Sequence, residues 1–501
     1  MRKPLRIFYA AGPGNVIGTY RHWKQHRDDP TQLAVTYSGQ FYQVVHELGA
    51  KAYVIASCPV RDRVRDGEFN IQHQPIPFED NSGPLYHFGQ IIYGLRLLIA
   101  SLWFRADVAI VCGGTHWFVL SLMSLLGIRV VPSLHCMLWR AGSNRIQYRY
   151  MWLRRFVRKW DSWFFRHQTT AILSVSAQLT AQVRSLLQAN DDVGASPPIY
   201  TFTPIYRRGP FDRISPPPAG KPFRVLYIGR IERNKGVFDL SRVALRLAHE
   251  GHTDIEFDLC GSGNALPELR RCVEATGIGS HFRLHGHCNQ RQFVALLSDC
   301  HVVIAPTQCD FLEGFNKVVV EGILSHRLVI TSSICPSLSL VRDAALEVRP
   351  NDVQGYGDAI LRLRDDPALY QRLVNSAAAL SPQFYDETVS WGENLHTVLR
   401  KLQQAEAKTS WRTRADHLRE SNSGSARWPA RSSLVGVIAA LALGVLASLL
   451  GLNSSDRHAK DANSQISSKT GTTSTPLGTT SLAMHHPTPG HPDQSSLTGE
   501  P

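Results

Sequence analysis

The chain has 501 residues, of which 43% are hydrophobic and 19% are charged, as is typical of a globular protein with room for two domains. Its net charge of +13 indicates an anionic partner, such as nucleic acid, an anionic membrane or a phosphorylated ligand. The nine cysteines include no CxxC pair, which favours a reducing cytosol over a disulfide framework or a zinc site.

Short β-rich runs alternate with longer helical patterns in the first 206 residues. The opening sequence, MRKPLRIFYAAGPG, has an apolar stretch too short for a signal peptide, and Arg6 interrupts it, so we interpret it as a first buried strand. Strands are predicted at Arg6–Ala10, Ala52–Ser57, Val108–Cys112 and Val130–Leu134. This alternation predicts a Rossmann-like domain, 1–206, with a parallel sheet covered by helices on both faces.

A basic and aromatic segment, RAGSNRIQYRYMWLRRFVRKWDSWFFRHQ (140–168), lies within this half and contains one acid, Asp161. Such a segment can form an amphipathic helix on an anionic membrane surface. Two alternatives are a helix whose aromatic residues pack in the core and a nucleic-acid-binding element. We favour the membrane, because the C-terminal region independently points to it.

A proline-rich stretch, 207–222, predicts a linker between two domains. A second series of strands follows it, at Arg224–Ile228, Glu256–Leu259, His281–His285, Val302–Ala305 and Leu328–Thr331. These predict a second Rossmann-like domain, 223–383. The cleft between the carboxyl ends of the two sheets is then the expected ligand site.

The composition changes after residue 405. A basic polar linker, 406–433, leads to the uncharged apolar segment 434–452, which is long enough to cross a bilayer and predicts a transmembrane helix. A Ser/Thr/Pro-rich tail, 453–501, predicts disorder. Small residues recur every four positions in the apolar segment and would permit self-association of this helix: Gly436, Ala440, Gly444 and Ser448.

Three stretches of the second domain carry candidate ligand-binding residues. In RVLYIGRIERNKGVFDL (224–240), Arg230 and Lys235 lie between a strand end and a helix opened by Gly236, an arrangement suited to a diphosphate. The alternative for these two residues is that they are ordinary solvated cations. In FDLCGSGNALPELRR (257–271), Gly261 and Gly263 permit close backbone approach to a ligand or simply a tight turn.

The third stretch is EGFNKVVVE, 313–321, with a helix expected to begin near Phe315 or Asn316. Glu313 and Glu321 would repel phosphate, but both can accept hydrogen bonds from sugar and ribose hydroxyls. Their alternatives are helix N-terminal charge for Glu313 and a solvated or paired surface acid for Glu321.

In combination and in this order, the three stretches resemble the second domain of the family-4 retaining glycosyltransferases, which have the GT-B fold. The resemblance runs from about 225 to 363, and is fainter over the AGPG and SLHC stretches of the first domain. One departure follows Glu321, where the family usually has Ala and then a Gly-Pro pair, and this chain has Gly322 and SHRLV (325–329).

The resemblance implies a role for each matching residue. Glu313 would contact the donor sugar, Glu321 the ribose, and Arg230 and Lys235 the diphosphate, whose growing charge they would stabilise as it leaves. The remaining contacts implied are the backbone at Gly314 and Phe315 with sugar and phosphate, the loop at Gly12 and Gly14 closing over the donor, and a histidine facing the sugar, His135, with His116 as a second candidate. No covalent nucleophile, cofactor or metal is expected, and 384–405 resembles the helix that crosses back to the first domain.

The sequence therefore predicts a retaining glycosyltransferase that moves a sugar from a nucleotide-diphosphate sugar to a membrane-borne, polyprenyl-linked or saccharide acceptor in bacterial surface polysaccharide or exopolysaccharide synthesis. It would be a single-pass protein of the inner membrane with its catalytic domains in the cytoplasm, and nucleic acid is not an expected partner. Two alternatives remain: a catalytically silent scaffold that binds sugar nucleotides, and a sugar-nucleotide epimerase of the same fold.

Overall fold

The computed structural model describes residues 3–79, 81, 83–140, 151–188, 196–215, 220 and 222–417. The apolar segment 434–452, the tail 453–501 and most of the basic linker lie outside these residues, as does the first part of the aromatic segment, 141–150.

The first domain is built on an eight-stranded sheet with the strand order β3-β4-β2-β1-β5-β6-β7-β8. All neighbouring strands are parallel except β3 and β4, which form an antiparallel pair at one edge. Its strands are β1 (Arg6–Ala11), β2 (Lys51–Ala56), β3 (Arg63–Asp66), β4 (Phe69–His73), β5 (Val108–Val111), β6 (Arg129–Leu134), β7 (Ile172–Ser174) and β8 (Ile199–Thr201). Its helices are α1 (Val16–Lys24), α2 (Tyr37–Glu47), α3 (Pro84–Trp103), α4 (Trp117–Leu125), α5 (Met151–His167) and α6 (Ala177–Gln188).

The second domain has a parallel six-stranded sheet in the order β11-β10-β9-β12-β13-β14. Its strands are β9 (Phe223–Ile228), β10 (Ile255–Cys260), β11 (Phe282–Gly286), β12 (Val302–Ala305), β13 (Leu328–Ser332) and β14 (Ala345–Val348). The helices that follow the linker are α7 (Arg208–Phe211), α8 (Val237–His249), α9 (Leu266–Thr276), α10 (Gln290–Asp299), α11 (Lys317–Leu324), α12 (Leu338–Val341), α13 (Val353–Asp365), α14 (Pro367–Leu380) and α15 (Trp391–His417).

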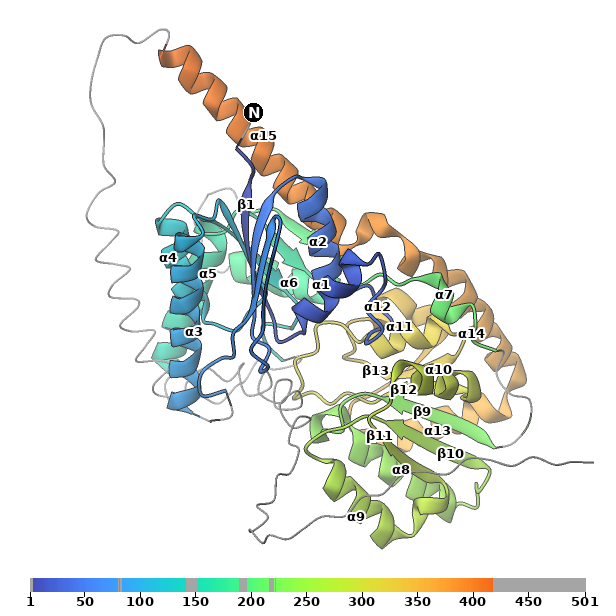
Figure 1. The fold of residues 1–501 in the computed structure, drawn as a ribbon. Helices are drawn as coiled ribbons and strands as arrows, with labels where there is room; N and C mark the ends of the chain where they lie inside the picture. Colours follow the sequence, from blue (N-terminus) through green and yellow to red (C-terminus); the bar gives the residue numbers. More distant parts are fainter. Residues whose placement is uncertain are drawn as a thin grey trace, which may run out of the picture.

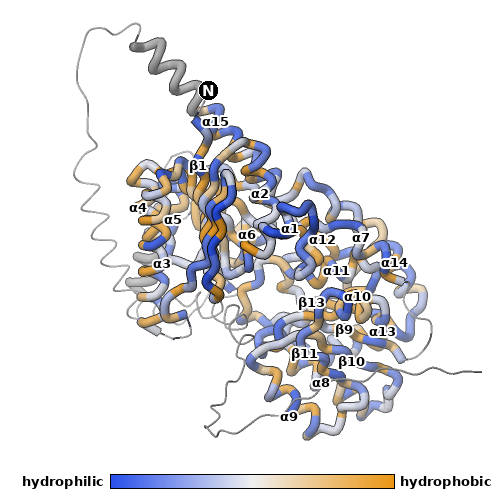
Figure 2. The backbone as a smooth tube through the Cα atoms, viewed as in Figure 1, coloured by the Kyte–Doolittle hydropathy of each residue, from blue (hydrophilic) through white to orange (hydrophobic). Residues whose placement is uncertain are grey.

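Alternation along the strands explains why helices cover both faces of each sheet. In β9, Val225 and Tyr227 point into the core shared with α8, whereas Leu226 points to the opposite face, where it packs with Leu297 of α10. In the first domain α3, α4 and α5 lie on one face, with α1 and α2 on the other, and Figure 2 shows the hydrophobic strands enclosed between them. The nine strands predicted from the sequence are confirmed, while β3, β4, β7, β8 and β14 were missed because they are short or flank weak apolar runs.

Two crossovers connect the domains. The first follows β8 and contains α7, and the second returns before α15, which then runs along the first domain (Figure 1). Trp391, Leu395 and Leu399 of α15 are fully buried in the core of the first domain. The return of the chain predicted for 384–405 is therefore observed.

α3 is the one helix, among the residues described, that is long and apolar enough to span a membrane, but more than half of its apolar window is buried in the first domain. Its outer face nevertheless exposes a stripe of large apolar side chains at helical spacing: Leu85, Phe88, Leu95, Ile99, Leu102 and Trp103. We call this stripe the α3 apolar face.

Candidate active site at the domain junction

The loop after β9 places two cations at the carboxyl end of the second sheet. Gly236 has φ = 76° and caps α8, and a Cβ there would lie 2.1 Å from the Pro306 carbonyl oxygen, so only glycine fits. Lys235 Nζ lies 3.8 Å from the centre of the Phe311 ring, and the Arg230 guanidinium lies 5.3 Å from the same centre. The two predicted diphosphate ligands are thus brought together over one aromatic ring.

Glu313 joins the same group, which we call the donor cluster (Arg230, Lys235, Phe311 and Glu313). Its Oε1 lies 2.8 Å from Lys235 Nζ, and both side chains are only 12–13% exposed. Its Oε2 accepts hydrogen bonds from Thr307 Oγ1 (2.9 Å) and from Asn316 Nδ2 (3.2 Å). Lys235 is not a solvated surface cation, which was the alternative considered for it.

Arg230 is held from its other side by Glu232. Its Nη1 lies 2.6 Å from Glu232 Oε1, and Glu232 is 2% exposed. A buried carboxylate next to a partly exposed arginine fixes the guanidinium while leaving donors free to turn towards a ligand.

The two glycines after β10 lie close to this loop. Gly261 has φ = 157°, and a Cβ there would lie 1.7 Å from the Gly229 carbonyl oxygen, so the turn after β10 is in backbone contact with the turn after β9. Gly263 follows in the same turn, where its carbonyl accepts a hydrogen bond from the Leu266 amide. The close approach at Gly261 is therefore between the backbones of the two turns.

The structure pairs Cys260 with Cys288 in a disulfide, whereas the other seven cysteines are free. One such pair is not a disulfide framework, and the reducing cytosol that the sequence favours stays a prediction. The register explains the proximity, because Cys260 is opposite Gly286 in β11, two residues before Cys288.

The donor cluster faces the first domain directly. A Cβ on Gly314 would lie 2.0 Å from the His135 carbonyl oxygen and 2.9 Å from Cys136 Cα, so the backbones of the two domains touch here. Phe315 packs against hydrophobic clusters of both domains. The SLHC strand end and the EGF loop, which are 178 positions apart (313 − 135), therefore meet at the junction.

His135 lies at this junction, but its ring turns into the first domain. Its Nε2 lies 2.9 Å from Ser133 Oγ, which also accepts a hydrogen bond from Trp391 Nε1, and its ring packs 4.5 Å from that of Tyr37. Burial, assisted by Lys317, lowers the pKa of His135 to about 3, so the ring is neutral at physiological pH.

The other first-domain candidates lie in different surroundings. His116 stacks on His87 and Phe118 in the packing of α3 against α4, with a pKa lowered to about 3 by burial. Gly12 and Gly14, at the carboxyl end of β1, have open space around their Cα atoms, as a loop needs if it is to close over a ligand.

Glu321 is not part of the donor cluster. It lies in the middle of α11, four residues after Lys317, is 7% exposed, and burial raises its pKa to about 7 although Lys317 opposes the shift. Burial also lowers the pKa of Lys317, whose Nζ donates to Gln32 Oε1 of the first domain over 3.0 Å. The two acids of the stretch 313–321 are thus one ion-paired carboxylate and one desolvated carboxylate.

Residues 210–379 match the family described as "Glycosyl transferases group 1". The match covers 170 of the 501 residues (379 − 210 + 1) and lies mostly in the second domain. Two curated relatives support a transferase enzyme: alpha-D-kanosaminyltransferase of Streptomyces kanamyceticus, 27% identical over 36% of this chain and 45% of its own, and glycogen synthase of Mycobacterium tuberculosis, 26% identical over 48% and 56%. The chain thus spans about half the length of the curated relatives it matches.

Solved structures extend the likeness to both domains. The trehalose 6-phosphate synthase of Burkholderia multivorans has a TM-score of 0.59 at 14% identity, covering 81% of this chain and its whole chain. The sucrose-phosphate synthase of Thermosynechococcus elongatus has a TM-score of 0.57 at 14% identity, covering 80% and its whole chain. Anabaena HepE, solved with UDP and glucose, has a TM-score of 0.51 at 12% identity, and the match covers 81% of this chain and the whole HepE chain. At such identities the likeness shows the GT-B fold alone, in agreement with the predicted fold class.

The transferase domain also contains a buried cation that the sequence analysis missed. Arg327, in the SHRLV departure, is fully buried, and its side chain donates to the carbonyls of Leu297 and Ser298 at the end of α10 and of Ser215 in the linker. It caps a helix C-terminus whose carbonyls need donors. The unusual sequence after α11 thus ties α10 to the linker.

Other missed residues hold the cluster in place: Glu232, Thr307 and Asn316. Asn316 directly follows EGF at the N-cap position of α11, so its place in the sequence could have pointed to it. The roles of Thr307 and Glu232 depend on tertiary packing and have no such local signal. In the part of the chain that the structure describes, no group of three His, Cys, Asp or Glu side chains could hold a metal ion.

The aromatic segment 140–168 is partly explained by packing. Phe164 and Phe165 are fully buried, and Arg166 donates to the Leu187 carbonyl (3.0 Å). These three side chains serve the core of the first domain and are not available to a membrane surface, as the core-packing alternative expected. The segment 141–150 lies outside the described residues.

Proposed function

We propose that the protein is a retaining glycosyltransferase that transfers a sugar from a nucleotide-diphosphate sugar to a membrane-borne acceptor, in bacterial surface polysaccharide or exopolysaccharide synthesis. The observation that carries the proposal is the donor cluster at the junction of the two domains. Its two cations are held by carboxylates beside the EGF loop, which touches the first domain at His135. HepE, a protein of the same fold, has been solved with UDP and glucose.

The residues suggest how the reaction proceeds. Arg230 and Lys235 would bind the diphosphate and stabilise the charge that grows on it as the glycosidic bond breaks. Lys235 would exchange its contact with Glu313 for one with phosphate, leaving Glu313 to accept hydrogen bonds from the sugar hydroxyls. The acceptor hydroxyl would attack from the side of the leaving group, with its proton passing to a donor phosphate oxygen, so the anomeric configuration is retained.

His135 needs a revised role in this proposal. Because its ring is neutral and its Nε2 is engaged with Ser133, it would contribute its backbone carbonyl to the packing against Gly314 rather than a proton. Gly12 and Gly14 would cover the donor from the first domain, and closure would exclude water that otherwise hydrolyses it.

Two features support a membrane-borne acceptor. The apolar segment 434–452 has the length of a bilayer span, and the α3 apolar face exposes Ile99 (66%) and Trp103 (70%) on the first domain. We expect the catalytic domains to lie on the cytoplasmic face of the inner membrane, because nucleotide sugars are cytosolic.

The test uses the full chain in vesicles that contain bacterial polyprenyl-linked saccharides, with a panel of nucleotide sugars. We expect release of nucleotide diphosphate that depends on the lipid fraction, and a lipid product whose new linkage, by NMR, has the anomeric configuration of the donor. Donor binding without turnover would instead support a silent scaffold, and an altered free sugar nucleotide would support an epimerase.

A further inference from the structure

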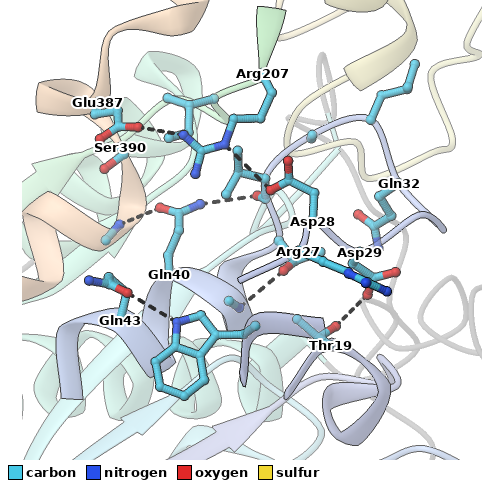
Figure 3. A pocket seen from close by; sticks show the side chains of 18 of the residues that line it. Thr19, Arg27, Asp28, Asp29, Gln32, Gln40, Gln43, Arg207, Glu387 and Ser390 are labelled. Carbon is cyan, nitrogen blue, oxygen red and sulfur yellow. Dashed lines mark hydrogen bonds and ion pairs between the residues drawn. The ribbon is translucent and has the colours of Figure 1, made fainter. Parts of the chain in front are cut away.

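A hollow lies at the hinge between the domains. It has a volume of about 580 Å³ and is lined by α1 and the loop after it, α2, both crossovers and the first turns of α15 (Figure 3). Its lining includes Gln290 of the second domain but none of Arg230, Lys235, Glu313 and Glu321. We call it the hinge cavity.

Arg207 joins three segments around this cavity. Its Nη1 lies 3.0 Å from Glu387 Oε1 in the second crossover, and its Nε lies 3.6 Å from Asp28 Oδ1 in the loop after α1 (Figure 3). All three side chains are more than half exposed, so these ion pairs are weak, worth roughly 0–1 kcal/mol each. The walls can therefore adjust to a bound molecule.

The chemistry of the walls selects against anions and for hydroxyl groups. Five carboxylates and two arginines are among the described residues that line the cavity. Amides add paired donors and acceptors, as in Gln43, which accepts a hydrogen bond from Trp23 Nε1 (3.2 Å). Carboxylates and amides pair well with vicinal hydroxyls, and the flat face of an indole packs on the C–H face of a sugar ring.

One buried polar atom in the wall has no partner. His396 is 9% exposed, its Nδ1 lies 3.8 Å from Glu393 Oε2, and its Nε2 makes no hydrogen bond to any described residue. A buried nitrogen without a partner destabilises the folded protein. This nitrogen belongs to a residue that lines the hinge cavity.

We propose that the hinge cavity is a second binding site, which takes a neutral saccharide. It is separate from the donor cluster, and its wall contacts the second domain where Gln32 accepts a hydrogen bond from Lys317 of α11. The saccharide class follows from the walls alone and does not depend on the function proposed above.

The test measures binding of the full-length protein, in detergent, to an array of neutral glycans. Glu393→Trp introduces a bulky side chain at the cavity wall from a half-exposed position on α15, and Arg400→Trp places the same side chain two turns further on, outside the lining. We expect the wild type, Arg400→Trp and Lys235→Ala to bind the same glycans, and Glu393→Trp to bind them about tenfold or more weakly. Gln43→Ala, which adds no bulk, should weaken the binding of the same glycans. A circular-dichroism melt checks that each variant is folded.

The results separate this proposal from the proposed reaction. Absence of glycan binding by the wild type, or equal binding by Glu393→Trp, would overturn it. Binding lost in Lys235→Ala would place the saccharide in the donor site and also overturn it. Binding of spermine in place of any glycan would show that the carboxylates select a cation, and would also overturn the proposal of a neutral saccharide. Donor turnover is measured separately, so its failure leaves the glycan result unchanged.

Discussion

The two ends of the stretch 313–321 hold the same functional group in different ways. At the first end, Glu313 is matched by Lys235 and by two hydrogen-bond donors, so its charge is compensated and its position is fixed. At the other end, Glu321 is buried in the middle of α11, where desolvation raises its pKa to about 7. The difference teaches that position in the motif does not decide the state of a carboxylate, whereas its neighbours do.

The largest effect is expected at the compensated end, from Lys235→Ala. This change removes a cation from the proposed diphosphate site and leaves Glu313 nearly buried without its partner. We expect kcat for donor turnover to fall about 10²–10³-fold. Arg233→Ala, two residues away but 66% exposed, is the matched control and should stay close to the wild type. An equal loss in both variants would indicate a general electrostatic effect of the loop.

The next effect concerns stability. It tests whether the fold near Glu321 depends on Arg327, which lies three residues after the end of α11. Arg327→Met removes the donors that the carbonyls of Leu297, Ser298 and Ser215 use, in a fully buried place. We expect the free energy of unfolding to fall by about 3 kcal/mol, measured by urea denaturation. Arg362→Met, at an exposed position of α13, should change it by less than about 0.5 kcal/mol. A small effect at Arg327 would mean that a helix cap can be lost here without cost.

The positions of these residues in the fold could largely be predicted from the sequence, but the electrostatic surroundings of their side chains could not. The continuous apolar runs of β9 and β12 are typical of a parallel sheet covered on both faces, and the strand ends bring Arg230, Lys235 and Glu313 to one edge of the sheet. The buried state of Glu321, the turned ring of His135 and the role of Arg327 depend on side chains from distant elements. Examples of such distant groups are Tyr37, Trp391 and the α10 carbonyls, whose contacts cannot be predicted from the local sequence.

The contact between the domains offers a third way to test the compensated end. In Gly314→Ala, the new Cβ would need to displace the His135 carbonyl, which lies 2.0 Å from its ideal position. Because small displacements of reacting groups are costly, we expect kcat/KM to fall about 10–10²-fold with the stability little changed. Gly209→Ala, at a glycine with open space around it, is the control. Retained activity in Gly314→Ala would show that the EGF loop can move away from the first domain during catalysis.

The smallest effect distinguishes the desolvated end by its pH dependence. If ionised Glu321 accepts hydrogen bonds from the donor ribose, donor affinity should fall about tenfold between pH 8 and pH 6 as the carboxyl protonates through its pKa of about 7. Glu321→Gln should bind more weakly at pH 8 and lose this dependence, whereas Glu274→Gln, at an exposed position of α9, should keep it. Titration calorimetry with a nucleotide sugar, at pH 6 and pH 8, measures the donor affinity of the wild type and of both variants.

Stability gives the same carboxyl an independent signature. Its pKa in the folded protein lies above the ordinary value of 4.5, so the folded state binds more protons, and the free energy of unfolding should decrease as the pH rises from about 4.5 to about 7. Glu321→Gln should remove that slope. An unchanged slope in Glu321→Gln would mean that the carboxyl is hydrated in solution, and the contrast between the two ends of the stretch would then disappear.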